Sequence, residues 1–210
     1  MRLLLTRHGE TVFNRGGRYS GQREIPLTAL GEAQHTLLRR RLAGESIERV
    51  VCSDLTRCVT IAALVAADHR RQAEPDRALR ELGFGAWEGL TYAEASARDP
   101  VLMAAFDDDP AHVTPPGGES LTTVAARMSA RLEVLLREHD HVGRTGALLL
   151  VGHSGSLRAL LCTLLGIPLA RYWMLRLDPA SLTVLDIYPA SPIVSVLNDT
   201  CHLYDAEDRG

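Results

Sequence analysis

The sequence predicts an α/β protein, a three-layer sandwich in which helices flank a mostly parallel central sheet. Short apolar runs alternate with helical patterns along the chain, which is typical of a sheet covered by helices on both faces. One run, 146–151, is continuously apolar, as expected for a central parallel strand. With 210 residues, 46% of them hydrophobic, the chain can bury one substantial core. We therefore expect a single domain over residues 1–210.

The first half begins with a strand at Met1–Thr6 and continues with alternating elements. A helix is expected from Thr28 to about Leu42, because the Thr28 hydroxyl suits an N-cap. Its expected apolar stripe consists of Leu30, Leu37, Leu38 and Leu42. A second short strand at Arg49–Cys52 and a helix at Leu55–Ala67 follow.

The second half repeats the strand-to-helix pattern after a weaker stretch. Between about 82 and 118 the periodicity fades, which predicts a small helical cap excursion over the sheet. The 146–151 strand then leads to a helix at Leu157–Leu165, closed by Gly166 and Pro168. Late strands at Leu182–Tyr188 and Ile193–Leu197 are expected at or near a sheet edge, and 205–210 as a frayed tail.

Composition excludes several classes of protein. A net charge of -3 argues against nucleic acid or an anionic membrane as a partner. The longest apolar run, 157–169, is too short to span a bilayer, and Arg7 interrupts the first run too early for a signal peptide. The cysteines lack CxxC spacing and suit reduced thiols: Cys52, Cys58, Cys162 and Cys201. We expect a cytoplasmic protein, either monomeric or homo-oligomeric.

Polar groups follow the expected strands at four places. These are Arg7–His8, Ser53 with Arg57, Arg80–Glu81, and His153. Ligands of open α/β sheets bind outside the carboxyl ends of the strands, so these groups are expected to converge. Guanidinium groups and a helix N-terminus both suit phosphate oxygens. Together, the histidines and arginines predict a pocket for a doubly charged anion.

Glu81 is the acid of this predicted pocket. A carboxylate among cations normally stays ionised, so a general-acid role requires that it be partly desolvated. Metal binding fits poorly, because His139 and His141 flank an acid without the spacing of a metal site. We therefore expect no metal and no other cofactor.

At these residues the chain resembles the histidine phosphatase superfamily, the phosphoglycerate-mutase-like proteins, over nearly its whole length. The matching segments are 6–11 with Asn14, 20–21, 26–28, 52–57, 79–81, 84–89, 116–120 and 151–155. The chain departs from the family pattern at Glu24, commonly Asp, at Ile61, often Thr, and at Ser154, commonly Gly.

The resemblance implies roles for individual residues. His8 would be the nucleophile that becomes phosphohistidine, and Glu81 would donate and accept the proton. The groups around the phosphoryl oxygens would be Arg7, Arg57 and His153. The residues implied for the substrate site are Asn14, Ser20 and Gly21, with Ser154 beside them.

Within the family, the cap favours a phosphatase acting on a small phosphomonoester. Residues 91–118 contain one basic residue, Arg98, which offers no clamp for a bisphosphate. They contain five acids: Glu94, Asp99, Asp107, Asp108 and Asp109. Segments 14–21, 50–53, 184–188 and 196–199 resemble alpha-ribazole phosphatases of cobalamin synthesis. A phosphoglycerate mutase and a catalytically silent, phosphate-binding regulatory protein are the alternatives.

Three aromatic residues of this region, Trp87, Tyr92 and Phe106, could contact an aromatic leaving group. Large aromatic side chains bury much apolar area in cores. We therefore expect core packing for at least two of them.

Overall fold

A six-stranded sheet forms the centre of the computed structural model, which describes residues 1–141, 146–188 and 191–204. The strands are β1 (Arg2–Arg7), β2 (Ile47–Ser53), β3 (Ala73–Asp76), β4 (Ala147–Gly152), β5 (Leu182–Ile187) and β6 (Pro192–Asp199). Their order is β3-β2-β4-β1-β5-β6. The four strands β3, β2, β4 and β1 are parallel to one another. At the β1 side of the sheet, β5 pairs antiparallel with β1, and β6 pairs antiparallel with β5. The predicted α/β class and the mostly parallel sheet are confirmed.

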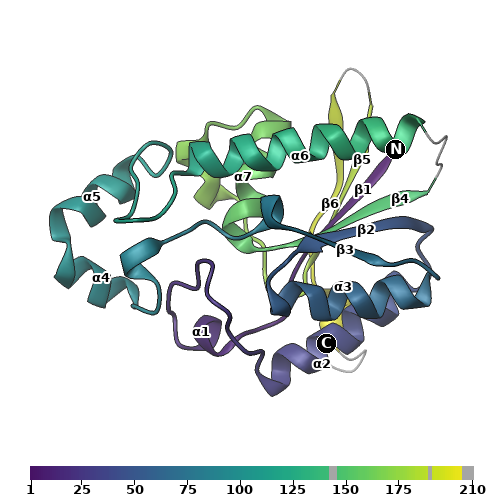
Figure 1. Cartoon of the computed structure of the whole chain (residues 1–210), viewed down its shortest axis with the longest axis horizontal. Helices are drawn as coiled ribbons and strands as arrows, with labels where there is room; N and C mark the ends of the chain where they lie inside the picture. The colour runs from purple at the N-terminus through teal and green to yellow at the C-terminus, as the bar shows by residue number, and fades with distance from the viewer. Residues whose placement is uncertain (142–145, 189–190, 205–210) are drawn as a thin grey trace.

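Helices cover both faces of this sheet (Figure 1). One face carries α2 (Ala29–Leu42) and α3 (Thr56–Asp68), and the other carries α6 (Leu121–His141) and α7 (Ser154–Leu165). Along β1, Leu3 and Leu5 join the hydrophobic core on the α6–α7 side, whereas Leu4 joins the core on the α2–α3 side. Successive side chains of a strand point to opposite faces, so a strand covered on both sides is apolar throughout.

The predicted cap excursion is helical and projects beyond the end of the sheet (Figure 1). It contains α4 (Tyr92–Arg98) and α5 (Pro100–Asp108). Trp87 and Phe106 are buried and pack edge to face, with 5.6 Å between ring centroids. Tyr92 is exposed. The expectation that at least two of the three aromatic residues belong to the core is confirmed.

Several boundaries and elements differ from the sequence prediction. Helix α7 begins at Ser154 and not at Leu157, and Leu30 of α2 is 50% exposed and lies outside the apolar stripe. The buried positions of α2 are Gly31, His35, Leu38 and Leu42. Elements without a sequence prediction are β3, α6, α1 (Val12–Arg15), and the 3-10 helices η1 (Arg77–Leu79), η2 (Gly85–Trp87), η3 (Leu169–Met174) and η4 (Cys201–Leu203). The tail expected at 205–210 lies outside the described residues.

Over the described part of the chain, no helix has the length and apolar character needed to cross a membrane. Cys52, Cys58 and Cys162 are buried thiols, and Cys201 is exposed.

Candidate active site

The two predicted site histidines lie side by side because of the register between β1 and β4. Arg7 of β1 is paired with Gly152 of β4, so His8 and His153 leave the sheet at the same edge. The His8 amide donates to the Gly152 carbonyl at 3.2 Å. The two rings meet edge to face with centroids 5.0 Å apart, and both are at most 2% exposed.

Arg57 joins these histidines from the first turn of α3, and it is 1% exposed. Its Nε donates to Nδ1 of His153 at 3.3 Å. Its Nη1 and Nη2 donate to the carbonyls of Arg23 and Gly21, at 2.7 and 2.9 Å. Each Nη keeps a second N–H that these carbonyls do not use, so the guanidinium can still bind phosphate oxygens.

Arg7 supplies a second guanidinium to the same place. Its Nη1 donates to the Leu177 carbonyl at 2.8 Å, while its buried Nε has no hydrogen-bond partner among the described residues. Burial lowers the pKa of Arg7 to about 10, so the group is still cationic at neutral pH. His8, His153, Arg7 and Arg57 together are called the floor below.

The hydrogen bonds of the floor fix the tautomers of its histidines. Nδ1 of His8 lies 2.7 Å from the Gly9 carbonyl, which can only accept, so Nδ1 carries the proton and Nε2 keeps its lone pair. Burial first, and then the charges of Arg57 and Arg7, hold the pKa of His8 well below its ordinary 6.5. The pKa of His153 is lowered by burial and by the Arg57 charge. A neutral His8 with a free Nε2 is a competent nucleophile.

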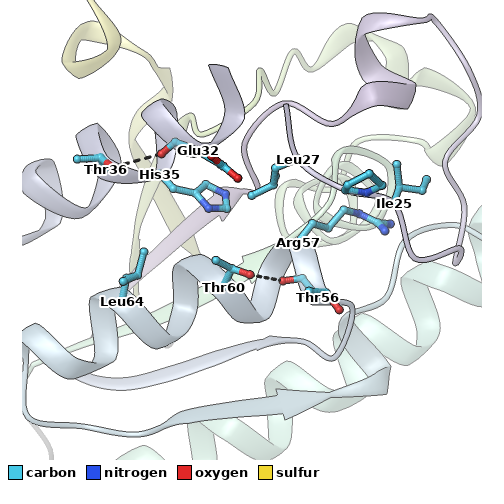
Figure 2. Close-up of a pocket in the computed structure, with 10 residues that line it drawn as sticks. Ile25, Leu27, Glu32, His35, Thr36, Thr56, Arg57, Thr60 and Leu64 are labelled. Atoms are coloured by element: carbon cyan, nitrogen blue, oxygen red, sulfur yellow. Dashed lines mark hydrogen bonds between the residues drawn. The ribbon is translucent and has the colours of Figure 1, made fainter. Parts of the chain in front are cut away.

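His35 holds the peptide next to His8. Its Nε2 accepts a hydrogen bond from the Gly9 amide at 2.8 Å, and burial lowers its pKa to about 4. Figure 2 shows His35 and Arg57 at a cavity of about 450 Å³ between α2 and α3. Of the floor residues, only Arg57 lines this cavity. It therefore lies behind the floor, away from His8 and His153.

Glu81 reaches the site after η1 and is 8% exposed. Its Oε1 accepts hydrogen bonds from the amides of Leu82 and Ser156 at 2.8 and 2.9 Å, and its Oε2 accepts one from Gly155 at 3.1 Å. The carboxylate therefore caps the N-terminus of α7. This explains why α7 begins at Ser154, before the apolar periodicity that the sequence shows.

A network around Glu119 fixes the backbone of Glu81. Arg127 and Gln22 both donate to the Glu81 carbonyl, at 2.9 and 3.2 Å. Glu119 accepts from Arg127 at 3.0 Å through both oxygens and from Gln22 at 3.0 Å. Through Glu119, segment 116–120 thus helps to hold the backbone of Glu81 in place. The sequence of the segment alone does not reveal this role.

A pocket of about 190 Å³ opens in front of Glu81 and is called the mouth below. It is lined by Asn14, Arg18, Tyr19, Ser20, Glu81, Leu82, Phe84, Ser154, Gly155, Arg158, Tyr172 and Trp173. Three predicted substrate-site residues, Asn14, Ser20 and Ser154, therefore line it. Gly21 does not line the mouth, and its carbonyl accepts a hydrogen bond from Arg57. None of the five cap acids lines the mouth, although one of them, Glu94, pairs with Arg18 of the mouth.

The mouth also contains groups that sequence reasoning missed, above all Arg158, Tyr172 and Trp173. Arg158 lies one helical turn after Ser154, and side chains four residues apart share a face of a helix. That spacing is the signal that could have placed Arg158 in the site.

Of the three departures from the family pattern, Ser154 lines the mouth, whereas Glu24 and Ile61 do not. Both carboxylate oxygens of Glu24 lie 3.1–3.2 Å from the Thr56 amide, at the start of α3. Ile61 is fully buried in the core.

Among the described residues, no group of His, Cys, Asp and Glu side chains could hold a metal ion. His139 is buried on α6, and the side chain of His141 lies outside the description.

The floor and Glu81 all lie within the part of the chain that matches one known family. The sequence profile of the histidine phosphatase superfamily (branch 1) matches residues 3–200. The chain belongs to this superfamily.

Relatives of this histidine phosphatase include named phosphatases and a probable phosphoglycerate mutase. The chain is 34% identical to the adenosylcobalamin/alpha-ribazole phosphatase of Escherichia coli K12, over 94% of this chain and 96% of that one. It is 30% identical to phosphoserine phosphatase 1 of Hydrogenobacter thermophilus, over 97% and 94%. The crystal structure of the alpha-ribazole phosphatase from Shigella flexneri matches with a TM-score of 0.85 and 34% identity, over 95% and 96%. The protein is an enzyme, a phosphatase of the histidine phosphatase type, and family members act on small phosphorylated substrates.

Proposed function

We propose that this chain is a metal-independent phosphomonoester hydrolase that works through a phosphohistidine at His8. The observation that carries the proposal is the fixed tautomer of His8. The Gly9 carbonyl takes the Nδ1 proton, which leaves the Nε2 lone pair among buried guanidinium groups. Phosphoryl transfer asks a protein mainly for positioning and charge stabilisation.

In the first step, Nε2 of His8 forms a bond to phosphorus while the ester P–O bond breaks in line. Arg7 and Arg57, with His153 beside them, stabilise the charge on the phosphoryl oxygens, so no metal ion is needed. Glu81 gives a proton to the departing alkoxide. Oε2 of Glu81 suits this task, since it accepts only one amide and belongs to a carboxyl that lines the mouth.

In the second step, water attacks the phosphorus of phosphohistidine. Glu81, now a carboxylate, takes the proton of that water. The N–P bond breaks, its electron pair returns to Nε2, and inorganic phosphate leaves. The enzyme is restored with Glu81 protonated and His8 neutral.

Two substrate classes have support. The sequence matches to alpha-ribazole phosphatases, together with the aromatic side chains of Tyr19, Phe84 and Trp173 in the mouth, favour alpha-ribazole phosphate. The cation Arg158, which lies in the same pocket, favours a phosphate ester of an anionic alcohol. Hydrolysis itself is common to both classes.

The decisive experiment traps the covalent intermediate. The chain is mixed with a phosphorus-32-labelled monoester in the presence of a chelator and is quenched without acid. We expect an acid-labile, base-stable label that His8→Ala abolishes together with turnover. Label on His153 would overturn the assignment of the nucleophile. Efficient interconversion of 2- and 3-phosphoglycerate with little phosphate release would show a mutase, and binding without any turnover would show a silent regulator.

A further inference from the structure

Arg158 is a cation of the mouth whose charge has no acidic partner. It belongs to no ion pair among the described residues, and its buried Nε has no hydrogen-bond partner there. Its guanidinium carbon lies 5.7 Å from the ring centroid of Trp173, which leaves the hydrogen-bonding edge of the group unused. Buried polar groups normally find partners, so an unused donor in a pocket points to a ligand.

Tyr172, which lines the same pocket, carries a second unused donor. The residue is 1% exposed, and its hydroxyl has no hydrogen-bond partner within the described chain. Burial raises the pKa of Tyr172, so the hydroxyl keeps its proton. Tyr172 and Arg158 come from η3 and α7, which pack against each other. A guanidinium and a protonated phenol together suit an oxygen anion.

The neighbouring charges do not satisfy Arg158. Arg18, the other cation of the mouth, is neutralised by Glu94, with 2.7 Å between Nη1 and Oε2. Asp178 is paired with Arg176 at 2.8 Å and accepts from Asn198 at 2.9 Å. The Glu81 carboxylate accepts three backbone amides. The positive charge of Arg158 is therefore available to a bound molecule.

We propose that Arg158, with the Tyr172 hydroxyl, binds a carboxylate on the alcohol that the enzyme releases. The proposal rests on the proposed hydrolysis at His8 and Glu81, and it names the substrate class of that site. Both donors line the pocket that contains Glu81, the group assigned to protonate the leaving oxygen. Ligand pockets for drug-sized molecules occupy roughly 300–1,000 Å³. At about 190 Å³, the mouth suits a short hydroxy acid better than a nucleoside.

A matched pair of substrates isolates the carboxylate. 3-Phosphoglycerate and glycerol 3-phosphate share a three-carbon skeleton. The first carries a carboxylate where the second carries a hydroxymethyl group. We expect kcat/KM for phosphate release to be at least about tenfold higher for 3-phosphoglycerate, since hydrogen bonds to a charged group are stronger than those between neutral groups. Arg158→Met should remove most of that preference, and Tyr172→Phe a smaller part. Arg171→Met, an exposed cation on η3 outside the pocket, should keep it.

The outcomes separate this proposal from the hydrolysis on which it rests. If the wild-type chain releases no phosphate from an aryl phosphate, the proposed function fails. If it hydrolyses the aryl phosphate but prefers glycerol 3-phosphate or alpha-ribazole phosphate, the carboxylate site is wrong. Equal losses in Arg158→Met for both members of the pair would also overturn it, because Arg158 would then serve the phosphoryl group itself.

Discussion

The floor and the mouth of this site differ in how the chain builds them. Three floor residues, Arg7, His8 and His153, lie at the ends of β1 and β4, where strand register fixes them. The mouth takes its side chains from the α1 region, the cap, α7 and η3. The floor depends on neighbouring strands of one sheet, whereas the mouth depends on how separate helices pack.

Because of this difference, we expect the floor to govern the chemical step and the mouth to govern substrate specificity. A buried, cationic floor suits any phosphomonoester, because all of them present the same phosphoryl oxygens. In the proposed mechanism the mouth faces the alcohol, which varies between substrates. Changes in the floor are therefore expected to reduce turnover of every ester, and changes in the mouth to alter the choice among esters.

After the loss of turnover expected in His8→Ala, the largest effect is expected at Glu81, which lies between the two regions. Glu81→Gln should lower kcat for alkyl phosphates by about 10²–10⁴-fold, because their alkoxides need a proton. Activated aryl phosphates should lose far less. Steady-state kinetics on the two ester types is the measurement. Equal losses would assign the acid to another group, with Glu88 or Glu10 the next candidates.

Arg57→Lys tests whether the floor needs the guanidinium fork or only a positive charge. Lysine cannot donate to the Gly21 and Arg23 carbonyls and to phosphate in the same way. We expect kcat to fall by about 10²–10³-fold for alkyl and aryl esters alike, as for loss of a donor to developing charge. Arg77→Lys, an exposed arginine of η1, is the control. A loss confined to one ester type would contradict the expectation that changes in the floor affect all esters alike.

The charge of the floor also sets its pH range. His8 must be neutral to attack, and its lowered pKa keeps it neutral below pH 6.5. Removing a cation that lowers this pKa must raise it, so Arg57→Gln should move the acid limb of kcat/KM toward neutral pH. Arg57→Lys, which keeps the charge, should leave the limb near its original position. At a pH well below both pKa values, a shift of one unit is about a tenfold loss of the neutral form. If the acid limb of kcat/KM lies at the same pH in the wild type, Arg57→Gln and Arg57→Lys, a group other than His8 titrates there.

Glu119→Gln tests the support behind Glu81. Neutral glutamine weakens the charged contact with Arg127, and the Glu81 backbone loses its fixed position. We expect a loss of about tenfold in kcat, corresponding to roughly 1.4 kcal/mol, and the loss should be larger for alkyl than for aryl phosphates. Glu133→Gln, an exposed carboxylate on α6, is the matched control. A uniform loss on both ester types would indicate a general structural defect.

The smallest effect is expected at the rim of the mouth. Trp173 is 53% exposed and contributes the aromatic face beside Arg158. Trp173→Ala should raise KM about two- to fivefold, in line with a partly exposed cation–π contact, with a smaller change in kcat. A kcat loss as large as that of Arg57→Lys would place Trp173 in the chemistry and break the distinction between the two regions.

The sequence by itself determined five of the six strands of the sheet and the residues of the floor. The leucines of β1 and β4 are apolar without interruption because both sheet faces are covered, and the polar residues that follow mark the strand ends. Parallel strands bring those ends to one edge, so Arg7, His8 and His153 could be placed together. Arg57 could be added because it lies one turn into the next helix.

Only the tertiary structure decided what surrounds that floor. Glu81 caps α7, Glu119 reaches the Glu81 backbone through Arg127, and Arg158 meets Tyr172, each across elements that lie far apart in the sequence. The five cap acids do not line the mouth, although their composition was the argument against a cap that clamps a bisphosphate. Composition counts the charges of a segment, whereas packing decides which of them a substrate meets.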